Sequence, residues 1–151
     1  MKRIATYRDF VGELTVTYKR TKEFIFTVKS SMSASEYLRT HFEECMDNNE
    51  EFKILHLNNS NKVVNVHHVS KGGETGTIVD IKLAVREALQ ICTKAVILCH
   101  NHPSGTLKPS TADKAITEKL KVAFGYFDIK VLDHIILTRE SYLSMADEGL
   151  L

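Results

Sequence analysis

The chain has 151 residues, of which 43% are hydrophobic and 26% are charged, and its formal net charge is +1. A single domain of this length can bury about 70% of the surface that its unfolded chain exposes, so an ordinary hydrophobic core is expected. The near-neutral charge excludes a protein that attracts nucleic acid through a global electrostatic field. No segment approaches the roughly 18 apolar residues that a membrane span requires.

The three cysteines, Cys45, Cys92 and Cys99, are scattered through the sequence without paired spacing. An odd and scattered set of cysteines, in a chain without a signal peptide, is typical of reduced thiols inside a cell. The first residues carry positive charge but lack the apolar run of a signal peptide. We therefore expect a cytoplasmic protein that does not contact the membrane.

The first thirty residues differ in charge from the rest of the chain. They hold seven Lys or Arg against three acidic residues, which gives +4, whereas the remainder carries −3. Residues 12–18 alternate in polarity as a half-buried strand does, and residues 24–28 are a second β-rich run. We expect residues 1–30 to form a β-rich arm or hairpin and residues 31–151 to form the main domain.

The first half of the main domain is predicted to contain two helices and two strands. A capping-box pattern at 33–36 predicts a helix that runs to about Met46. Strands are predicted over residues 52–57 and 63–69, with a polar turn between them. After a glycine-rich loop at 72–76, a further helix is expected to begin. Asp80 would cap that helix, whose apolar stripe would consist of Leu83, Val85, Ala88, Leu89 and Ile91.

The second half continues the alternation of helices and strands. The apolar run 95–99 predicts a buried strand, and a helix is expected from Ser110 to about Phe124. Residues 129–138 predict another strand, and residues 141–151 a short terminal hairpin or edge strand. This order predicts a mixed α/β (α+β) fold in which a central β-sheet is flanked by helices.

One segment in the second half combines residues that bind metals. His100 and His102 stand two residues apart at the end of the predicted strand, so their side chains point to the same side. A helix capped by Ser110 would place Asp113 in its first turn. Two imidazoles and a carboxylate can therefore meet at one point. Three protein ligands, with a fourth position left to water, are typical of a catalytic zinc site.

A simpler interpretation explains part of this pattern. Ser110-x-x-Asp113 is also a capping box, which by itself accounts for both residues as helix-capping groups. Two histidines at this spacing also occur in proteins without binding a common metal ion. Neither explanation accounts for the presence of both features on either side of one turn at the end of a buried strand, and their joint occurrence favours a metal site.

The same residues resemble a known signature. The spacing of His100, His102, Ser110 and Asp113 resembles the JAMM (JAB/MPN+) metallohydrolase motif at every position. Three blocks in order, 98–105, 109–113 and 132–136, resemble the RadC-like branch of that superfamily, over about the last four-fifths of the chain. The resemblance implies a JAB/MPN-like (cytidine deaminase-like) architecture and one zinc ion per chain, bound by the two histidines and Asp113.

The resemblance also implies a general base and an oxyanion donor. JAMM enzymes are similar in using a glutamate near the start of an earlier strand, and the register of RadC-like chains assigns that role to Glu50. Glu51 is the adjacent alternative, and its side chain would face the other way if the strand has already begun. Ser110 would donate its hydroxyl proton to the scissile carbonyl oxygen. For Asp133 and His134, which lie in the third block, we expect a hydrogen-bonding role at a strand end.

Three functional hypotheses from different classes follow. The leading one is a zinc metallopeptidase that hydrolyses a peptide or isopeptide bond in a peptide or protein substrate. The second is a DNA-associated module, supported by the basic segment 18–22 and by the DNA repair label of RadC-like proteins. The third is a non-catalytic interaction domain, against which the complete ligand set argues. The motifs of nucleobase deaminases and zincins are absent from the sequence.

Overall fold

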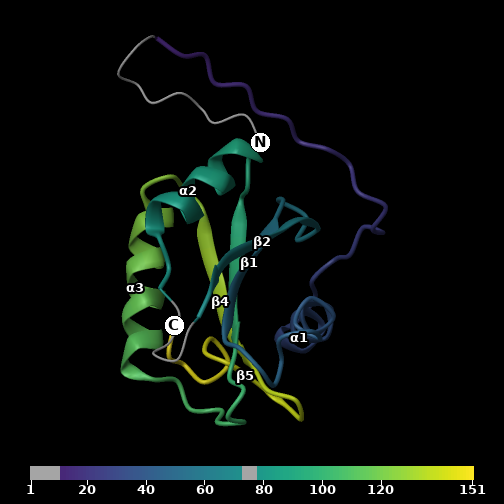
Figure 1. Ribbon diagram of the computed structural model, residues 1–151, viewed down its shortest axis with the longest axis vertical. Helices are drawn as coiled ribbons and strands as arrows, with labels where there is room; N and C mark the ends of the chain where they lie inside the picture. Colours follow the sequence, from purple (N-terminus) through teal and green to yellow (C-terminus); the bar gives the residue numbers. More distant parts are fainter. Residues whose placement is uncertain (1–10, 73–77) are drawn as a thin grey trace.

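The structure is a computed structural model that describes residues 11–72 and 78–151. Within these residues, five strands form one mixed sheet with helices on both faces, as shown in Figure 1. The strands are β1 (Glu51–Leu57), β2 (Val63–Lys71), β3 (Ala95–Asn101), β4 (Lys130–Leu137) and β5 (Tyr142–Ser144). The helices are α1 (Ser31–Arg39), α2 (Ile81–Gln90) and α3 (Thr111–Gly125). The predicted mixed α/β sheet flanked by helices is confirmed.

The strand order is β2-β1-β3-β4-β5, with β3 at the centre of the sheet. β3 and β4 are parallel and are connected by α3, whereas the other neighbouring pairs are antiparallel. The carboxyl ends of β3 and β4 therefore lie at the same edge as the amino end of β1. In register, His100 on β3 stands between Phe52 on β1 and Ile136 on β4.

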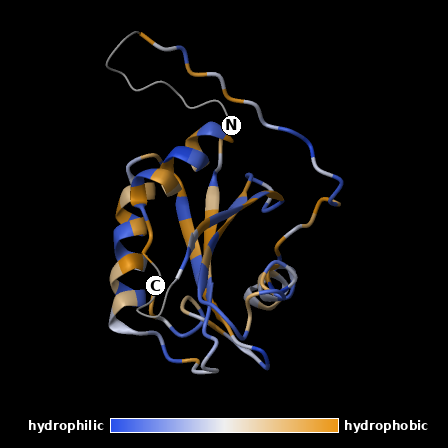
Figure 2. Ribbon diagram, in the orientation of Figure 1, coloured by the Kyte–Doolittle hydropathy of each residue, from blue (hydrophilic) through white to orange (hydrophobic). Residues whose placement is uncertain are grey.

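Two separate hydrophobic cores cover the two faces of the sheet. All seven residues of β3 are buried, and they alternate between the two cores, as a strand buried on both sides does. Ile97 and Cys99 pack in the core beneath α1, and Val96 and Leu98 pack in the core beneath α2 and α3. Figure 2 shows apolar and polar residues on each helix, the pattern of helices that cover a sheet and face solvent.

Helix α1 begins and ends earlier than the sequence pattern predicts. Its N-cap is Ser30, and Ser33 is the third helical residue of the capping box instead of its first member. The chain offers two overlapping capping patterns here, and the upstream one is used. The helix ends at Arg39 because residues 40–48 tighten into turns, in which Phe42 donates from its backbone N–H to the carbonyl of Arg39. The predicted end at Met46 is therefore wrong, although Met46 is still buried.

Helix α2 is capped as predicted, and part of its predicted apolar stripe is buried. The Asp80 side chain accepts hydrogen bonds from the first backbone N–H groups of the helix. Its buried residues are Ala84 and Ala88, whereas Leu83 and Leu89 are 39% and 47% exposed. The two small alanines allow the helix to approach the sheet closely, and the larger leucines of the predicted stripe lie at the margins of the contact.

The predicted hairpin in the arm is not formed in the part that the structure describes. Residues 11–26 contain no strand, and only Thr27 forms an isolated bridge, with Lys62. In Figure 1 residues 11–26 run outside the sheet as an extended trace. The basic segment between the two apolar runs lacks the Gly or Asn residues of a hairpin turn, and Val11 and Leu14 are 101% and 77% exposed. Residues 1–10 and most of the glycine-rich loop at 72–76 lie outside the described residues.

None of the helices in residues 11–72 and 78–151 has the length and apolar character needed to cross a membrane. The longest of them, α3, has fifteen residues and several charged side chains.

A buried histidine adds a pH-sensitive element to the core beneath α2. His56 on β1 is fully buried, and its Nδ1 lies 3.0 Å from the hydroxyl oxygen of Thr93. Its ring centroid is 5.9 Å from that of His67. Burial, with a smaller contribution from His67, lowers the pKa of His56 to about 3. Protonation of His56 therefore opposes folding.

We expect acid to destabilise the protein partly through His56. The unfolded chain takes up this proton below pH 6.5, whereas the folded chain resists it down to about pH 3, so stability is lost as the pH falls through this window. At pH 5 the loss attributable to His56 should be about 2 kcal/mol. Urea unfolding at pH 7.5 and 5.0 should therefore show a smaller decrease for His56→Gln than for the wild type. Equal decreases would contradict this prediction.

Candidate metal centre

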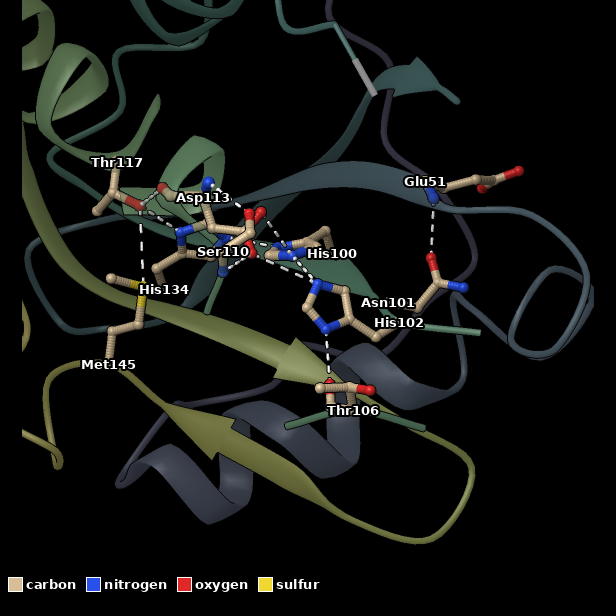
Figure 3. Close-up of polar contacts among 10 residues, drawn as sticks. All are labelled: Glu51, His100, Asn101, His102, Thr106, Ser110, Asp113, Thr117, His134 and Met145. Atoms are coloured by element: carbon tan, nitrogen blue, oxygen red, sulfur yellow. Dashed lines mark hydrogen bonds and ion pairs between the residues drawn. The ribbon is translucent and has the colours of Figure 1, made fainter. Parts of the chain in front are cut away.

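Three side chains with metal-binding atoms converge where β3 ends and α3 begins, as Figure 3 shows. His100 Nε2 lies 2.9 Å from His102 Nε2 and 3.2 Å from Asp113 Oδ1, and His102 Nε2 lies 3.5 Å from Asp113 Oδ2. A tetrahedral zinc ion with bonds of about 2.0 to 2.1 Å separates its ligand atoms by about 3.3 Å. The donor set and its spacing therefore fit a single zinc ion.

Local structure explains this convergence. His100 is 1% exposed and projects from the end of β3 toward α3. His102, two residues later, lies on the same side. The backbone N–H of His102 still donates to the carbonyl of Leu137, at 2.8 Å, so the parallel pairing of β3 with β4 extends one residue further. His102 Nδ1 faces the carbonyl oxygen of Thr106 at 2.6 Å, which fixes the second ring from the loop side.

The capping box and the metal site turn out to share Asp113. Ser110 Oγ accepts from the backbone N–H of Asp113 at 3.0 Å, and Asp113 Oδ2 accepts from the backbone N–H of Ser110 at 2.7 Å. The other carboxylate oxygen, Oδ1, faces His100 Nε2. The two interpretations of this motif are therefore compatible, because Oδ2 accepts the capping hydrogen bond while it faces His102 Nε2, and the cap does not use Oδ1.

The contacts between Asp113 and the two histidines shift the pKa values of these groups. Burial alone would raise the pKa of the Asp113 carboxyl, but hydrogen bonds from His100 and His102 outweigh it and hold that pKa well below its usual range. The same contact with Asp113 raises the pKa of His102 against the opposing effect of burial. An ionised carboxylate that faces two imidazole nitrogens attracts a cation, whether a proton or a metal ion.

The two adjacent glutamates lie in different environments. Glu51 begins β1, and its carboxylate pairs with Lys53 Nζ at 3.1 Å and with His68 Nε2 at 3.4 Å. Figure 3 shows the Glu51 side chain directed away from the histidines. Glu50, one residue earlier, is half-buried, and its charge helps to raise the pKa of His102. The structure thus brings Glu50 into electrostatic contact with the candidate centre and engages Glu51 elsewhere.

Asn101 stands between the two histidines, and no sequence pattern predicts a role for it. It is fully buried and faces the opposite side of β3. Its Oδ1 accepts from the backbone N–H of Glu51 at 2.8 Å, and its Nδ2 donates to the carbonyls of Cys45, Met46 and Asn49. Asn101 therefore ties the segment that carries Glu50 to the strand that carries the histidines. The available signal was a polar residue in a buried strand, which requires hydrogen-bond partners.

Asp133 and His134 form hydrogen bonds as expected, but they lie in the middle of β4 and not at a strand end. Asp133 accepts from the Ser144 hydroxyl at 2.5 Å and from the backbone N–H of Ala146 at 3.0 Å, so it holds the turn after β5. His134 is fully buried, and its Nε2 lies 2.7 Å from His100 Nδ1. The contact between His134 and a candidate ligand was not predicted, because it joins residues 34 positions apart.

Comparison with known proteins gives a consistent result. The model of a family described as "RadC-like JAB domain" matches residues 28–150. A "UPF0758 protein" of Flavobacterium johnsoniae is 54% identical over 101 residues, which cover 67% of this chain and 44% of that protein. A "UPF0758 protein" of Acidovorax sp. (strain JS42) is 38% identical over 121 residues, which cover 80% and 50%.

A shorter relative is matched over more of its length. The "UPF0758 protein YeeS" of Escherichia coli (strain K12) is 42% identical over 102 residues, which cover 68% of this chain and 69% of that protein. By contrast, the chain spans about half the length of the two relatives above. The names of these three proteins state no activity.

We expect Asn101→Asp to destabilise the protein by about 3 kcal/mol or more at pH 7, because a carboxylate oxygen would face three carbonyl oxygens in a buried site. The exposed Asn48 provides the control, since Asn48→Asp introduces the same charge at the surface and should cost less than about 0.5 kcal/mol. Urea denaturation of both variants measures the difference. Similar free energies of unfolding for the two variants would contradict the role of Asn101.

Proposed function

Because the chain belongs to the family of RadC-like JAB domains, we propose that it is a zinc-dependent hydrolase that cleaves amide bonds. The observation that carries this proposal is the convergence of His100, His102 and Asp113, whose ligand atoms all lie within 4.8 Å of one another. The arrangement leaves the fourth position of a tetrahedral ion to water, as in catalytic zinc sites.

His100 Nε2, His102 Nε2 and Asp113 Oδ1 would bind the ion. When bound, zinc polarises a carbonyl oxygen and lowers the pKa of a coordinated water from 15.7 to about 7. With a bound ion, the two histidines would be neutral donors and Asp113 the single anionic ligand. The protein would then neutralise only one of the two positive charges, which would preserve the electrophilic character of the ion.

Glu50 would act as the general base. Its charge acts on His102, which supports a position beside the ion and outside its ligand set. A carboxylate there can accept the proton of the attacking water and deliver it to the leaving amine. Glu51 is a poorer candidate because Lys53 and His68 neutralise its charge.

Ser110 would stabilise the developing oxyanion. Its Oγ accepts the hydrogen bond from the Asp113 N–H with a lone pair, so the hydroxyl proton remains available to a substrate. A donor aimed at the carbonyl oxygen is worth about 10² to 10³ in rate in comparable oxyanion holes. The helix cap also fixes the position of this hydroxyl.

The substrate class that we propose is a peptide or isopeptide bond in a peptide or protein. A Lewis acid, a general base and an oxyanion donor together promote the attack of water on an amide carbonyl, and the candidate metal centre, Glu50 and Ser110 would supply them. Since the longer relatives contain regions beyond the matched segment, the partners of a complete protein of this family lie outside this assignment.

A second candidate function is DNA binding by the arm. Lys19, Arg20 and Lys22 are all exposed, and they carry positive charge away from the mildly acidic domain. Phosphate contacts release counterions, so such binding would weaken steeply with salt. Fluorescence anisotropy with a labelled duplex at 50 and 200 mM salt tests it. Binding that is equally tight in a Lys19→Ala/Arg20→Ala/Lys22→Ala variant would exclude the arm as the binding element.

We expect protein purified without chelators to contain about one zinc ion per chain, and His102→Ala to lose it. Glu50→Gln should keep the zinc and lose hydrolysis of fluorogenic peptide amides by about 10² to 10⁴. Glu51→Gln is the matched control and should retain both properties. Elemental analysis and the initial rates measure these outcomes. A wild type that binds no added zinc would refute the proposal, and loss of hydrolysis in Glu51→Gln alone would reassign the base.

A further inference from the structure

A row of buried polar groups lies behind the candidate metal centre, where Figure 3 shows it running from His100 through His134 to Thr117. His100 Nδ1 is 2.7 Å from His134 Nε2, and His134 Nδ1 is 2.6 Å from Thr117 Oγ1. Thr117 Oγ1 donates in turn to the backbone carbonyl of Asp113, at 2.5 Å. His134 is 0% and Thr117 2% exposed, so no solvent competes for these bonds. The proposed reaction uses neither residue.

The direction of these hydrogen bonds follows from valence. His100 Nε2 faces Asp113 and His102, so a cation bound there requires a lone pair on Nε2 and leaves the ring proton on Nδ1. That proton is donated to His134 Nε2. An imidazole that accepts at Nε2 carries its own proton on Nδ1, which it donates to Thr117 Oγ1. The Thr117 proton is then free for the carbonyl of Asp113.

The row closes on the residue that supplies the third ligand. Thr117 stands four residues after Asp113 on α3, and its hydroxyl bonds back to the carbonyl of that earlier turn. The bonds therefore join β3, β4 and the first turn of α3 into one ring. Displacement of the His134 ring would change both the orientation of His100 and the position of Asp113.

From this geometry we infer that His134 and Thr117 are positioning residues that hold His100 as an Nε2 ligand and Asp113 at a fixed distance from it. The inference rests on the proposed metal site. Metal-binding histidines usually donate their second N–H to a carboxylate, a backbone carbonyl or water. Here the acceptor is an imidazole, which orients the ligand without adding a second negative charge to the site.

A purely structural role is the alternative, in which His134 and Thr117 satisfy only each other in the core. Thr117→Val distinguishes the two because valine matches the shape of threonine but removes the acceptor for His134. Thr117→Ser keeps the hydroxyl. Thr93→Val is the matched control, since Thr93 forms the same kind of buried contact with His56, which is not part of the candidate centre.

The test is zinc affinity of the full chain, measured by competition with a chelator, with the thermal unfolding of the metal-free proteins recorded alongside. We expect Thr117→Val to bind zinc about 10- to 100-fold more weakly than the wild type. Thr117→Ser should bind within a few-fold of the wild type. Thr93→Val should lose thermal stability to a similar extent as Thr117→Val but keep its zinc affinity.

A second measurement reads the direction of the hydrogen bonds directly. Long-range ¹H–¹⁵N correlation spectra of the zinc-loaded protein should show His134 as the Nδ1–H tautomer, which free histidine disfavours. Unchanged zinc affinity in Thr117→Val, or an Nε2–H tautomer of His134, would overturn this inference while leaving the proposed function intact. A wild type that binds no zinc would instead overturn the proposed function, and the positioning role with it.

Discussion

The structure depends on hydrogen-bond partners for the buried polar residues at the end of its central strand, β3. β3 is buried on both faces along its whole length, and its last two residues, His100 and Asn101, are polar. Buried polar groups that lack hydrogen bonds are costly, and those at the centre of a sheet are beyond the reach of bulk water. The surrounding elements must therefore present partners on each face. On one face these partners form the candidate metal centre. On the other face they are the backbone groups of the segment before β1, which Asn101 binds.

The alternation of the strand separates these two tasks. His100 faces α3, and its two ring nitrogens lie beside Asp113 on α3 and His134 on β4. Asn101 faces the core beneath α1, where its amide bonds with the backbone on both sides of Glu50. Adjacent residues of one strand thus position the ligands and the proposed base independently. A shift of one residue in the register of β3 would exchange the two faces and abolish both arrangements.

The sequence predicts the parts of this site that are local. His100 and His102 share a side through the two-residue period of a strand, and Ser110 and Asp113 share a helix start, so short spacings define the candidate ligands. β1 and β2 are predicted to within two residues because their apolar runs end at polar turns. The side-chain partners of Asn101 and His134 are 17 to 56 residues distant, and the topology of the sheet and α3, which no local pattern encodes, brings them together. The start of α1 is ambiguous in the sequence because two capping patterns overlap there.

The sharing of Asp113 between helix cap and candidate ligand has a consequence for the order of folding and metal binding. The cap fixes Asp113 through one hydrogen bond to its carboxylate and one from its backbone N–H, so the entropy of ordering this candidate ligand would be lost during folding and not during metal binding. The two apolar cores lie on the two faces of the sheet and do not include the candidate ligands. Structural zinc sites, by contrast, supply the free energy that folds small domains. In this chain the helix cap orders Asp113 during folding, as a preorganised site of the proposed kind would require.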